Sequence, residues 1–291
     1  MGPPTRRTTE ADRPRFGARP RPTDRTAVRC QAVSGAQPPE SSPDRFPASL
    51  LDDARARLAA ARSVTVLTGA GISADSGVPT FRGPAGLWRT HRAEELATPE
   101  AFARNPRLVW EWYDWRRGLI AAARPNPGHD ALAALERRRD RFTLITQNVD
   151  GLHTEAGSRR LLELHGNIWH LRCTVCGDVS TDRRVPLPLT PRLPSCVHCS
   201  GLLRPHIVWF GESLDPAVMQ AAVEAAMSCE VFLVVGTSGV VQPAASLASM
   251  AREAGAWVME LNPERSATAE VHCRLAGRAA EILPRLIPAD D

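Results

Sequence analysis

The stretch from Val64 to Arg82 reads VTVLTGAGISADSGVPTFR and decides the fold class. Its apolar, β-branched start, up to Leu67, predicts a buried strand. Gly69 and Gly71 follow and predict a tight turn whose backbone N–H groups approach a phosphate without an intervening Cβ. Strand, glycine-rich turn and helix start form the layout of a dinucleotide site, although the third glycine of the dehydrogenase fingerprint is absent. A turn without a ligand would show the same GAG, so this motif alone leaves both interpretations open.

Strands and helices alternate along the rest of the chain. Apolar runs at 142–145, 231–235 and 257–261 predict further buried strands, and the aromatic-rich stretch 204–212 predicts an extended segment. Helical spacing predicts helices near 49–61, 93–97, 106–123, 129–138, 216–227 and 244–254. Thr98-Pro99 and Asn105-Pro106 mark two helix starts, each with proline at the first helical position. Repetition of strand, polar turn and helix predicts an α/β fold with a doubly wound, parallel, Rossmann-like sheet. A smaller inserted lobe should hold a helical insertion and a four-cysteine zinc ribbon.

The first 47 residues differ from the rest in composition. They hold nine prolines, nine arginines, five acidic residues and almost no apolar periodicity, which predicts a disordered tail. Nine arginines against five acids give this segment a net charge of +4, which is the charge of the whole chain. The body is therefore formally neutral, and generic nucleic-acid binding is disfavoured. We expect one domain over 48–291, with a large lobe at about 48–84, 124–170 and 205–291, a helical insertion at 85–123 and a zinc-binding lobe at 171–204.

The hydropathy pattern predicts neither a membrane-spanning protein nor a secreted one. No apolar stretch is long enough for a membrane span, and no apolar segment follows the first methionine as in a secretory signal. We therefore expect no membrane association and a cytoplasmic location, with the mitochondrion as the alternative for a eukaryotic source. We also expect a monomer.

Four cysteines form the most specific local pattern. Cys173 and Cys176 form one CxxC pair, Cys196 and Cys199 form a second, and 19 residues lie between them. This spacing predicts one tetrahedral zinc ion, and four protein sulfurs leave no open coordination position, so the metal is structural. Two disulfides are the alternative, which the absence of a secretory signal disfavours.

Two other features have both a structural and a functional interpretation. In the helix over 106–123, Tyr113 and Arg116 share a face with Val109 and Ile120. Arg116 either extends past a core tyrosine towards solvent, which the pattern alone favours, or joins the phenol hydroxyl in binding a carboxylate. Similarly, His165 closes an apolar run, either as a core residue or as a general base.

The motifs GAGISADSGVPTFRG, TQNVDGLH, LHGN, the two CxxC pairs, RPHIVWFGE, GTS and LN occur in the order found in sirtuins. Residues 50–288 thus resemble that family of NAD-dependent protein lysine deacylases. The resemblance implies NAD as co-substrate, acylated lysine in proteins as substrate, and nicotinamide, O-acyl-ADP-ribose and free lysine as products. It implies His165 as the general base and Asn148 as a second catalytic residue. The implied NAD contacts are Gly69, Ala70, Gly71, Ser73, Ala74, Phe81, Arg82, Trp88, Gln147, Asn148, Asp150, His165, Gly236, Thr237, Ser238, Asn262 and Ala279.

The resemblance also implies an acyl preference. WYDWRR is similar to the Tyr-x-x-Arg of the branch that removes succinyl, malonyl and glutaryl groups, which reverses the interpretation of Tyr113 and Arg116 in favour of carboxylate binding. Small Ala93 and Ala97 match the roomy acyl site of that branch. The implied partners of the substrate backbone, as an added strand, are Val208, Trp209, Phe210, Gly211 and Glu212.

We therefore expect a desuccinylase and demalonylase that also deacetylates. Three alternatives remain open: a deacetylase with little acidic-acyl preference, a protein mono-ADP-ribosyltransferase, and a non-enzymatic binding module built on the zinc ribbon. Intact His165 and Asn148 disfavour the last.

Overall fold

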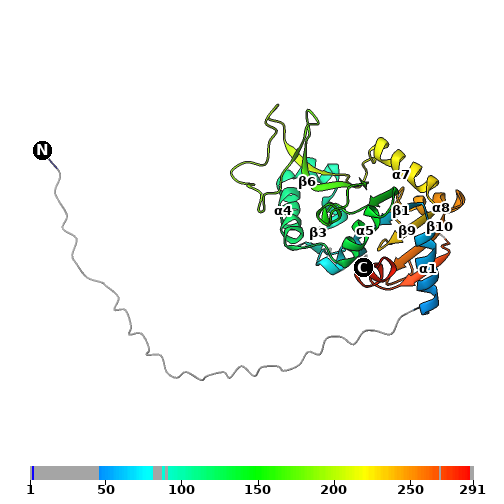
Figure 1. The fold of residues 1–291 in the computed structure, drawn as a ribbon. Coiled ribbons are helices and arrows are strands. Elements are labelled where there is room, and N and C mark those ends of the chain that lie inside the picture. Colours follow the sequence, from blue (N-terminus) through cyan, green and yellow to red (C-terminus); the bar gives the residue numbers. More distant parts are fainter. Residues whose placement is uncertain (1, 3–45, 81–86, 89–90, 269, 289–291) are drawn as a thin grey trace, which may run out of the picture. The chain divides into compact units, whose positions relative to one another are not determined.

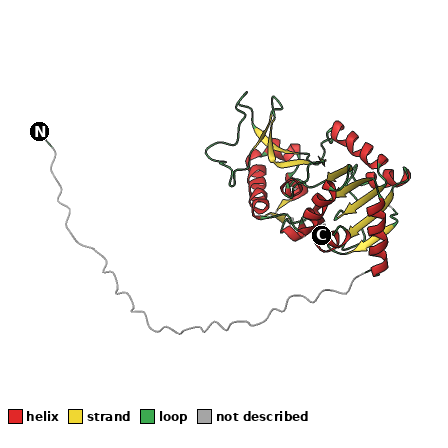
Figure 2. Cartoon of the chain, in the orientation of Figure 1, coloured by secondary structure: helices red, strands yellow, loops and turns green. Residues whose placement is uncertain are grey.

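The computed structural model describes residues 2, 46–80, 87–88, 91–268 and 270–288 (Figures 1 and 2). Of the predicted tail over 1–47, only residues 2, 46 and 47 are described, so its disorder stays a prediction. Phe46, which we assigned to that tail, is buried in a hydrophobic core.

A six-stranded parallel sheet forms the centre of the large lobe, with strand order β11-β10-β9-β1-β4-β5. Numbered along the chain within the sheet, this order is 6-5-4-1-2-3, which is the Rossmann order and confirms the predicted doubly wound parallel sheet. The strands are β1 (Ser63–Thr68), β4 (Arg141–Thr146), β5 (Leu161–Glu163), β9 (Val231–Val235), β10 (Trp257–Asn262) and β11 (Cys273–Ala276).

Helices cover both faces of this sheet (Figure 2). In β9, Val231, Leu233 and Val235 enter one hydrophobic core, while Phe232 and Val234 enter a second core on the opposite face. A strand buried on both faces has to be apolar throughout, which explains why continuous apolar runs predicted the sheet. The first core is closed by α1 (Ala48–Ala60), α5 (Pro127–Arg137) and α9 (Ala279–Leu286), and the second by α7 (Pro216–Ser228) and α8 (Ser246–Glu253).

The smaller lobe combines helices and an antiparallel sheet around a third core that contains Trp110, Tyr113 and Trp169. Thr98 and Asn105 accept N–H bonds that begin α3 and α4, each with proline at the first helical position, as predicted. The helices are α2 (Ala93–Leu96), α3 (Pro99–Arg104) and α4 (Pro106–Ala122), and the sheet is β7 (Val179–Thr181), β6 (Gly166–Cys173) and β8 (Leu203–Ile207). The predicted helical insertion and the predicted zinc-binding lobe thus share one hydrophobic core.

Three local predictions were wrong or incomplete. The predicted helix start after β1 is a pair of 3₁₀ turns, η1 (Ala70–Ile72) and η2 (Ala74–Ser76), ended by left-handed Gly77. The extended segment predicted up to Glu212 ends with β8, and a turn follows. The elements α6 (Leu152–Glu155), β11, α9 and the hairpin of β2 (Leu87–Trp88) and β3 (His91–Arg92) had no individual prediction. Within the described ranges, no helix has the length and apolar character needed to cross a membrane.

Candidate functional site

The order in which the chain adds strands to the sheet reverses between β1 and β9, and the predicted glycines Gly69 and Gly71 follow β1 at that point. Gly69 N–H donates to Val235 O (3.0 Å) and Gly71 N–H to Gly236 O (2.7 Å). A Cβ on Gly69 would lie 2.8 Å from Thr237 Cβ, and one on Gly71 would lie 2.7 Å from Gly236 Cα. The two glycines are therefore required for close approach of two strand ends, a reason that the sequence analysis did not contain. Ligands of open α/β sheets bind at this switch point.

Three predicted site residues form one buried hydrogen-bonded group beside the glycines. Ser73 Oγ donates to Asp150 Oδ2 (2.8 Å), and Asn148 Nδ2 donates both to Ser73 Oγ and to Gly69 O (3.1 Å each). Burial raises the pKa of the Asp150 carboxyl, which the Leu152 N–H, the Ser73 hydroxyl and the positive charge of Arg116 oppose. This group holds the loop after β1 against the loop after β4.

The remaining predicted NAD contacts extend along the same edge of the sheet. Gln147 Nε2 donates to Thr237 Oγ1 (3.0 Å), and Asn262 Nδ2 donates to Thr237 O (2.7 Å). Ser238 accepts from the Ala267 N–H, and Ala279 begins α9. Ala70 and Ala74 begin the two 3₁₀ turns. Phe81, Arg82 and the side chain of Trp88 lie outside the described residues.

His165 has the tautomer that a general base needs. Its Nδ1 lies 2.9 Å from Gln147 O, and because a carbonyl only accepts, the proton of the neutral ring is on Nδ1 and the lone pair on Nε2. Burial lowers the pKa of His165. The strand that follows, β6, helps to position it: Gly166, the first residue of β6, has φ +78°, and a Cβ there would clash with His206 O.

Two buried histidines behind this site were missed by the sequence analysis. His153 Nε2 lies 2.9 Å from Thr68 Oγ1, and His129 Nε2 lies 3.4 Å from Ser73 Oγ. The two rings are 4.9 Å apart, and burial lowers the pKa of His129 to about 4, so both rings are neutral near pH 7. His153 falls within the TQNVDGLH motif, but nothing in its local sequence shows that it meets a histidine from another helix.

The segment 208–212, expected to add a substrate strand, uses most of its own N–H groups internally. Val208 N–H donates to His165 O, Phe210 N–H to Ala97 O, and Trp209 N–H to the Glu212 carboxylate (3.0, 2.9 and 2.8 Å). Glu212 N–H donates back to Trp209 O, closing the turn that includes Gly211. These four N–H groups are therefore already engaged, and a substrate strand would have to pair through other backbone groups of the segment, so the strand addition stays a prediction. The segment instead links His165 to the helices of the smaller lobe.

Tyr113 and Arg116 lie beside this segment. Trp209 Nε1 donates to Tyr113 Oη (2.8 Å), and burial raises the pKa of Tyr113 to about 12 although the nearby positive charge of Arg116 lowers it. Arg116 Cζ lies 5.1 Å from the Trp112 ring, and Arg116 interacts electrostatically with both Tyr113 and Asp150. Ala93 and Ala97 are buried in the same core. We call Ala93, Ala97, Tyr113 and Arg116 the proposed acyl site.

The fully buried arginine of α4 is Arg117, not Arg116. Arg117 is 0% exposed, whereas Arg116, which interacts with Tyr113 on the predicted face, is partly exposed. Arg117 donates to the carbonyls of Ile168 (2.9 Å) and Arg184 (3.2 Å) and pairs with Asp182 (3.2 Å). It therefore ties α4 to the strands that hold the zinc cysteines.

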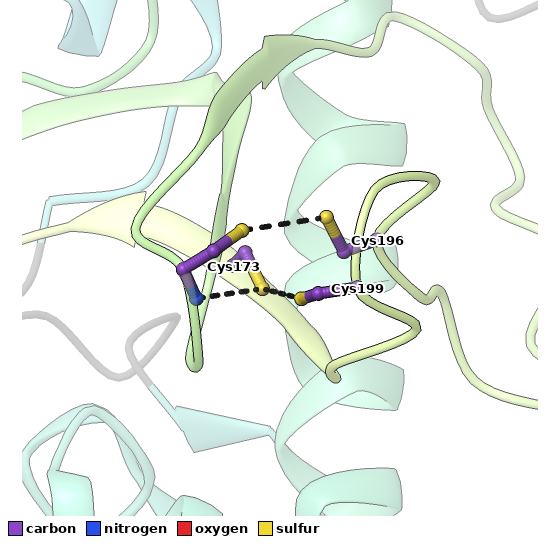
Figure 3. A group of neighbouring side chains, drawn as sticks. Cys173, Cys196 and Cys199 are labelled. Atoms are coloured by element: carbon purple, nitrogen blue, oxygen red, sulfur yellow. Dashed lines mark hydrogen bonds between the residues drawn. The ribbon is translucent and has the colours of Figure 1, made fainter.

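The four cysteines meet as the spacing predicted (Figure 3). Their sulfurs all lie within 4.8 Å of one another, with Cys173 to Cys199 at 3.4 Å and Cys176 to Cys196 at 3.7 Å, and no disulfide joins them. Sulfurs bound tetrahedrally at about 2.3 Å from zinc lie about 3.8 Å apart, so the set fits one zinc ion. The N–H groups of Cys176 and Val175 point at Cys173 Sγ and lower the pKa of that thiol to about 6, as a metal ligand requires.

Comparisons with known proteins agree with this geometry. The family model "Sir2 family" matches residues 69–243. An NAD-dependent protein deacylase of Aquifex aeolicus is 58% identical over 70% of this chain and 84% of its own length. NAD-dependent protein deacylase 2 of Pyrobaculum aerophilum is 56% identical over 79% and 92%.

Solved structures show the same fold. A crystal structure of a Sir2 homolog–NAD complex is 44% identical, with TM-score 0.77 over 81% of this chain and 92% of its own. A Sir2–p53 peptide–NAD⁺ complex is 30% identical, with TM-score 0.74 over 81% and 96%. With the Rossmann sheet, the four-cysteine cluster and the family model in agreement, this chain belongs to the Sir2 family, whose curated relatives are NAD-dependent protein deacylases.

Proposed function

We propose that this enzyme is an NAD-dependent protein-lysine deacylase that prefers succinyl and malonyl groups and removes acetyl groups more slowly. Family membership and the NAD-bound neighbour support the general reaction. NAD supplies the ADP-ribose that accepts the acyl group, with nicotinamide as leaving group. The residues proposed to hold it line the carboxyl edge of the sheet, from Gly69 and Ser73 to Gln147, Thr237 and Asn262.

His165 is the proposed general base. Its Nε2 lone pair is free to take a proton because Nδ1–H is held by Gln147 O. Asn148 donates to Ser73, and Ser73 donates to Asp150, so that the buried Asp150 carboxyl has a fixed orientation. Phe81 and Arg82 lie outside the described residues, and their proposed contacts rest on the sequence alone.

The proposed acyl preference rests on one observation: the Tyr113 hydroxyl is buried, and its proton has no hydrogen-bond acceptor among the described residues. Tyr113 is 2% exposed, and its oxygen accepts the Trp209 N–H. Among the described residues, no acceptor for the Tyr113 O–H proton is found. Arg116, a permanent cation, adds positive charge to the same place. A carboxylate at the end of a succinyl or malonyl chain supplies both the acceptor and the opposite charge.

The test compares succinyl-, malonyl- and acetyl-lysine forms of one peptide. A hydrogen bond to a charged group contributes about 1.5–3 kcal/mol, so Arg116→Met should reduce kcat/KM for the acidic acyl groups about ten- to a hundredfold while acetyl turnover changes little. Arg107→Met is the matched control, because Arg107 also lies on α4 but binds the Leu189 carbonyl of the zinc lobe.

Two results would contradict the proposal. If acetyl is the faster substrate and Arg116→Met behaves like the wild type, Arg116 only packs against Trp112 and the enzyme is a general deacetylase. If no peptide is turned over, transfer of ADP-ribose from labelled NAD to protein becomes the reaction to measure.

A further inference from the structure

The hydrogen bond between Trp209 and Tyr113 joins two buried side chains that are 96 residues apart in sequence. We infer that Trp209 is a positioning residue for acyl specificity: its indole N–H occupies an acceptor lone pair of the Tyr113 hydroxyl and so directs the hydroxyl proton towards the acyl group. This inference rests on the proposed acidic-acyl function and names the side chain that makes Tyr113 a donor to the substrate.

The direction of the bond is determined by the chemistry of its partners. Indole Nε1 can only donate, whereas a phenol hydroxyl can accept and also donates one proton. In the 2.8 Å contact Tyr113 therefore accepts, and its own proton points elsewhere. Both side chains are 2% exposed, so a Tyr113 hydroxyl turned to donate to the indole would leave the buried N–H without a partner, at a cost comparable to a lost hydrogen bond. Only one orientation of the hydroxyl is thus favourable.

Trp209 is itself held firmly. Arg204 Cζ lies 3.3 Å from the centre of its ring, and Arg204 donates to the Glu212 carboxylate and to Ile207 O (2.8 Å). The same carboxylate accepts the backbone N–H of Trp209. On another side, the Phe102 ring lies 5.3 Å from the indole. An indole fixed by an ion pair, its own backbone and an aromatic neighbour can impose its donor direction on Tyr113.

The backbone around Trp209 connects this device to the reaction site. Val208 N–H donates to His165 O and Phe210 N–H donates to Ala97 O. The indole is therefore placed relative to both the proposed base and the proposed acyl site. An acyl group whose distal end carries an acceptor oxygen gains the Tyr113 proton, whereas the methyl of an acetyl group offers no acceptor there.

The functional test is a double-mutant cycle read as the ratio of kcat/KM for succinyl- and acetyl-lysine peptides. Trp209→Phe keeps an aromatic ring and removes the N–H, so we expect the ratio to fall about three- to tenfold, the effect of one neutral hydrogen bond. In a Tyr113→Phe background, the same change should leave the ratio where Tyr113→Phe alone put it. Phe102→Leu is the control: it loosens packing on Trp209, keeps the N–H and should leave the ratio within about twofold of wild type.

A spectroscopic measurement tests the inference without turnover. Tyr113 is the only tyrosine in the chain, so a tyrosine signal reports on this residue alone. The intensity ratio of the tyrosine ring doublet in the Raman spectrum reports whether the hydroxyl mainly accepts or donates. We expect an accepting Tyr113 in the wild-type protein, a shift towards donation when a succinyl-lysine peptide binds, and no such shift with an acetyl-lysine peptide. This measurement also covers the case in which Trp209→Phe does not fold.

Each outcome has one meaning. If Tyr113→Phe lowers the ratio but Trp209→Phe does not, or if Trp209→Phe lowers it equally in both backgrounds, the inference is overturned while the proposed function stands. If neither Tyr113→Phe nor Arg116→Met lowers the ratio, the proposed acidic-acyl function fails, and the inference fails with it. A wild-type Raman spectrum of a donating Tyr113 in the free enzyme would also overturn the inference.

Discussion

Replacing Arg117 by methionine should loosen the zinc-binding strands from helix α4. The guanidinium is fully buried, donates to the carbonyls of Ile168, Asp182 and Arg184, and pairs with an Asp182 carboxylate that is 8% exposed. Its Cζ also lies 4.9 Å from the Trp169 ring. Methionine has a similar length and no donors, so the carbonyls and the carboxylate would remain buried with fewer partners.

The magnitude follows from these contacts. Removing one member of a buried ion pair costs about 3–5 kcal/mol. Here three carbonyls lose their donor and the Asp182 carboxylate keeps only the exposed Arg184 as its ion-pair partner. In a domain of this size each kcal/mol lowers Tm by about 2–4 °C, so Tm should fall by about 6–20 °C. We also expect faster transfer of zinc to a chromophoric chelator, since β6 carries both the Ile168 carbonyl and Cys173.

Arg184→Met provides the matched control. Arg184 binds the same carboxylate, but its side chain is 64% exposed, and an exposed ion pair contributes at most about 1 kcal/mol. Its Tm should therefore fall by less than about 4 °C. Equal Tm values for Arg117→Met and Arg184→Met, with equal rates of zinc transfer, would refute the reasoning that Arg117 joins the two parts of the smaller lobe.

Two further predictions concern stability near the site. The folded-state pKa of His129 is about 4 against about 6.5 in the unfolded chain, so its contribution to stability is complete above pH 6.5. As the pH drops from 6.5 towards 4, the free energy of unfolding should fall by up to about 1.4 kcal/mol per pH unit. Urea unfolding at several pH values should show a weaker dependence of this free energy on pH for His129→Gln, and an unchanged dependence would contradict this assignment. Gly166→Ala combines a left-handed φ with a clash between the new Cβ and His206 O, so it should lower the free energy of unfolding by more than about 2 kcal/mol and reduce kcat by displacing His165. Gly157→Ala is the control, because Gly157 has φ +102° but open space around it, so the variant carries the backbone strain without the clash. An equal loss in both variants would show that the clash is unimportant.

Local sequence was sufficient where the physical cause is itself local. Apolar runs predicted the central strands because a strand buried on both faces has no polar position. Thr98 and Asn105 predicted helix starts because a side-chain oxygen caps the N–H groups of the next turn. The CxxC pairs predicted zinc because each pair places two sulfurs on one tight turn.

Prediction failed where a partner comes from a distant segment. The helical pattern singled out Arg116 but gave no sign that the adjacent Arg117 is fully buried, because the carbonyls that accept its N–H groups belong to residues 168, 182 and 184. The turn at 208–212 forms because the Glu212 carboxylate binds Arg204 and the Trp209 N–H, which an aromatic, extended-looking sequence does not reveal.

The sequence by itself determined the sheet, the metal ligands and the residues gathered at the carboxyl edge, since periodicity and spacing are properties of neighbouring residues. Only the tertiary structure decided what those residues touch. It brought His129 against His153, Trp209 against Tyr113, and Gly69 against Thr237. The physical reason is that hydrogen-bond direction and close packing depend on which distant segments the folded chain places within a few ångströms of each other.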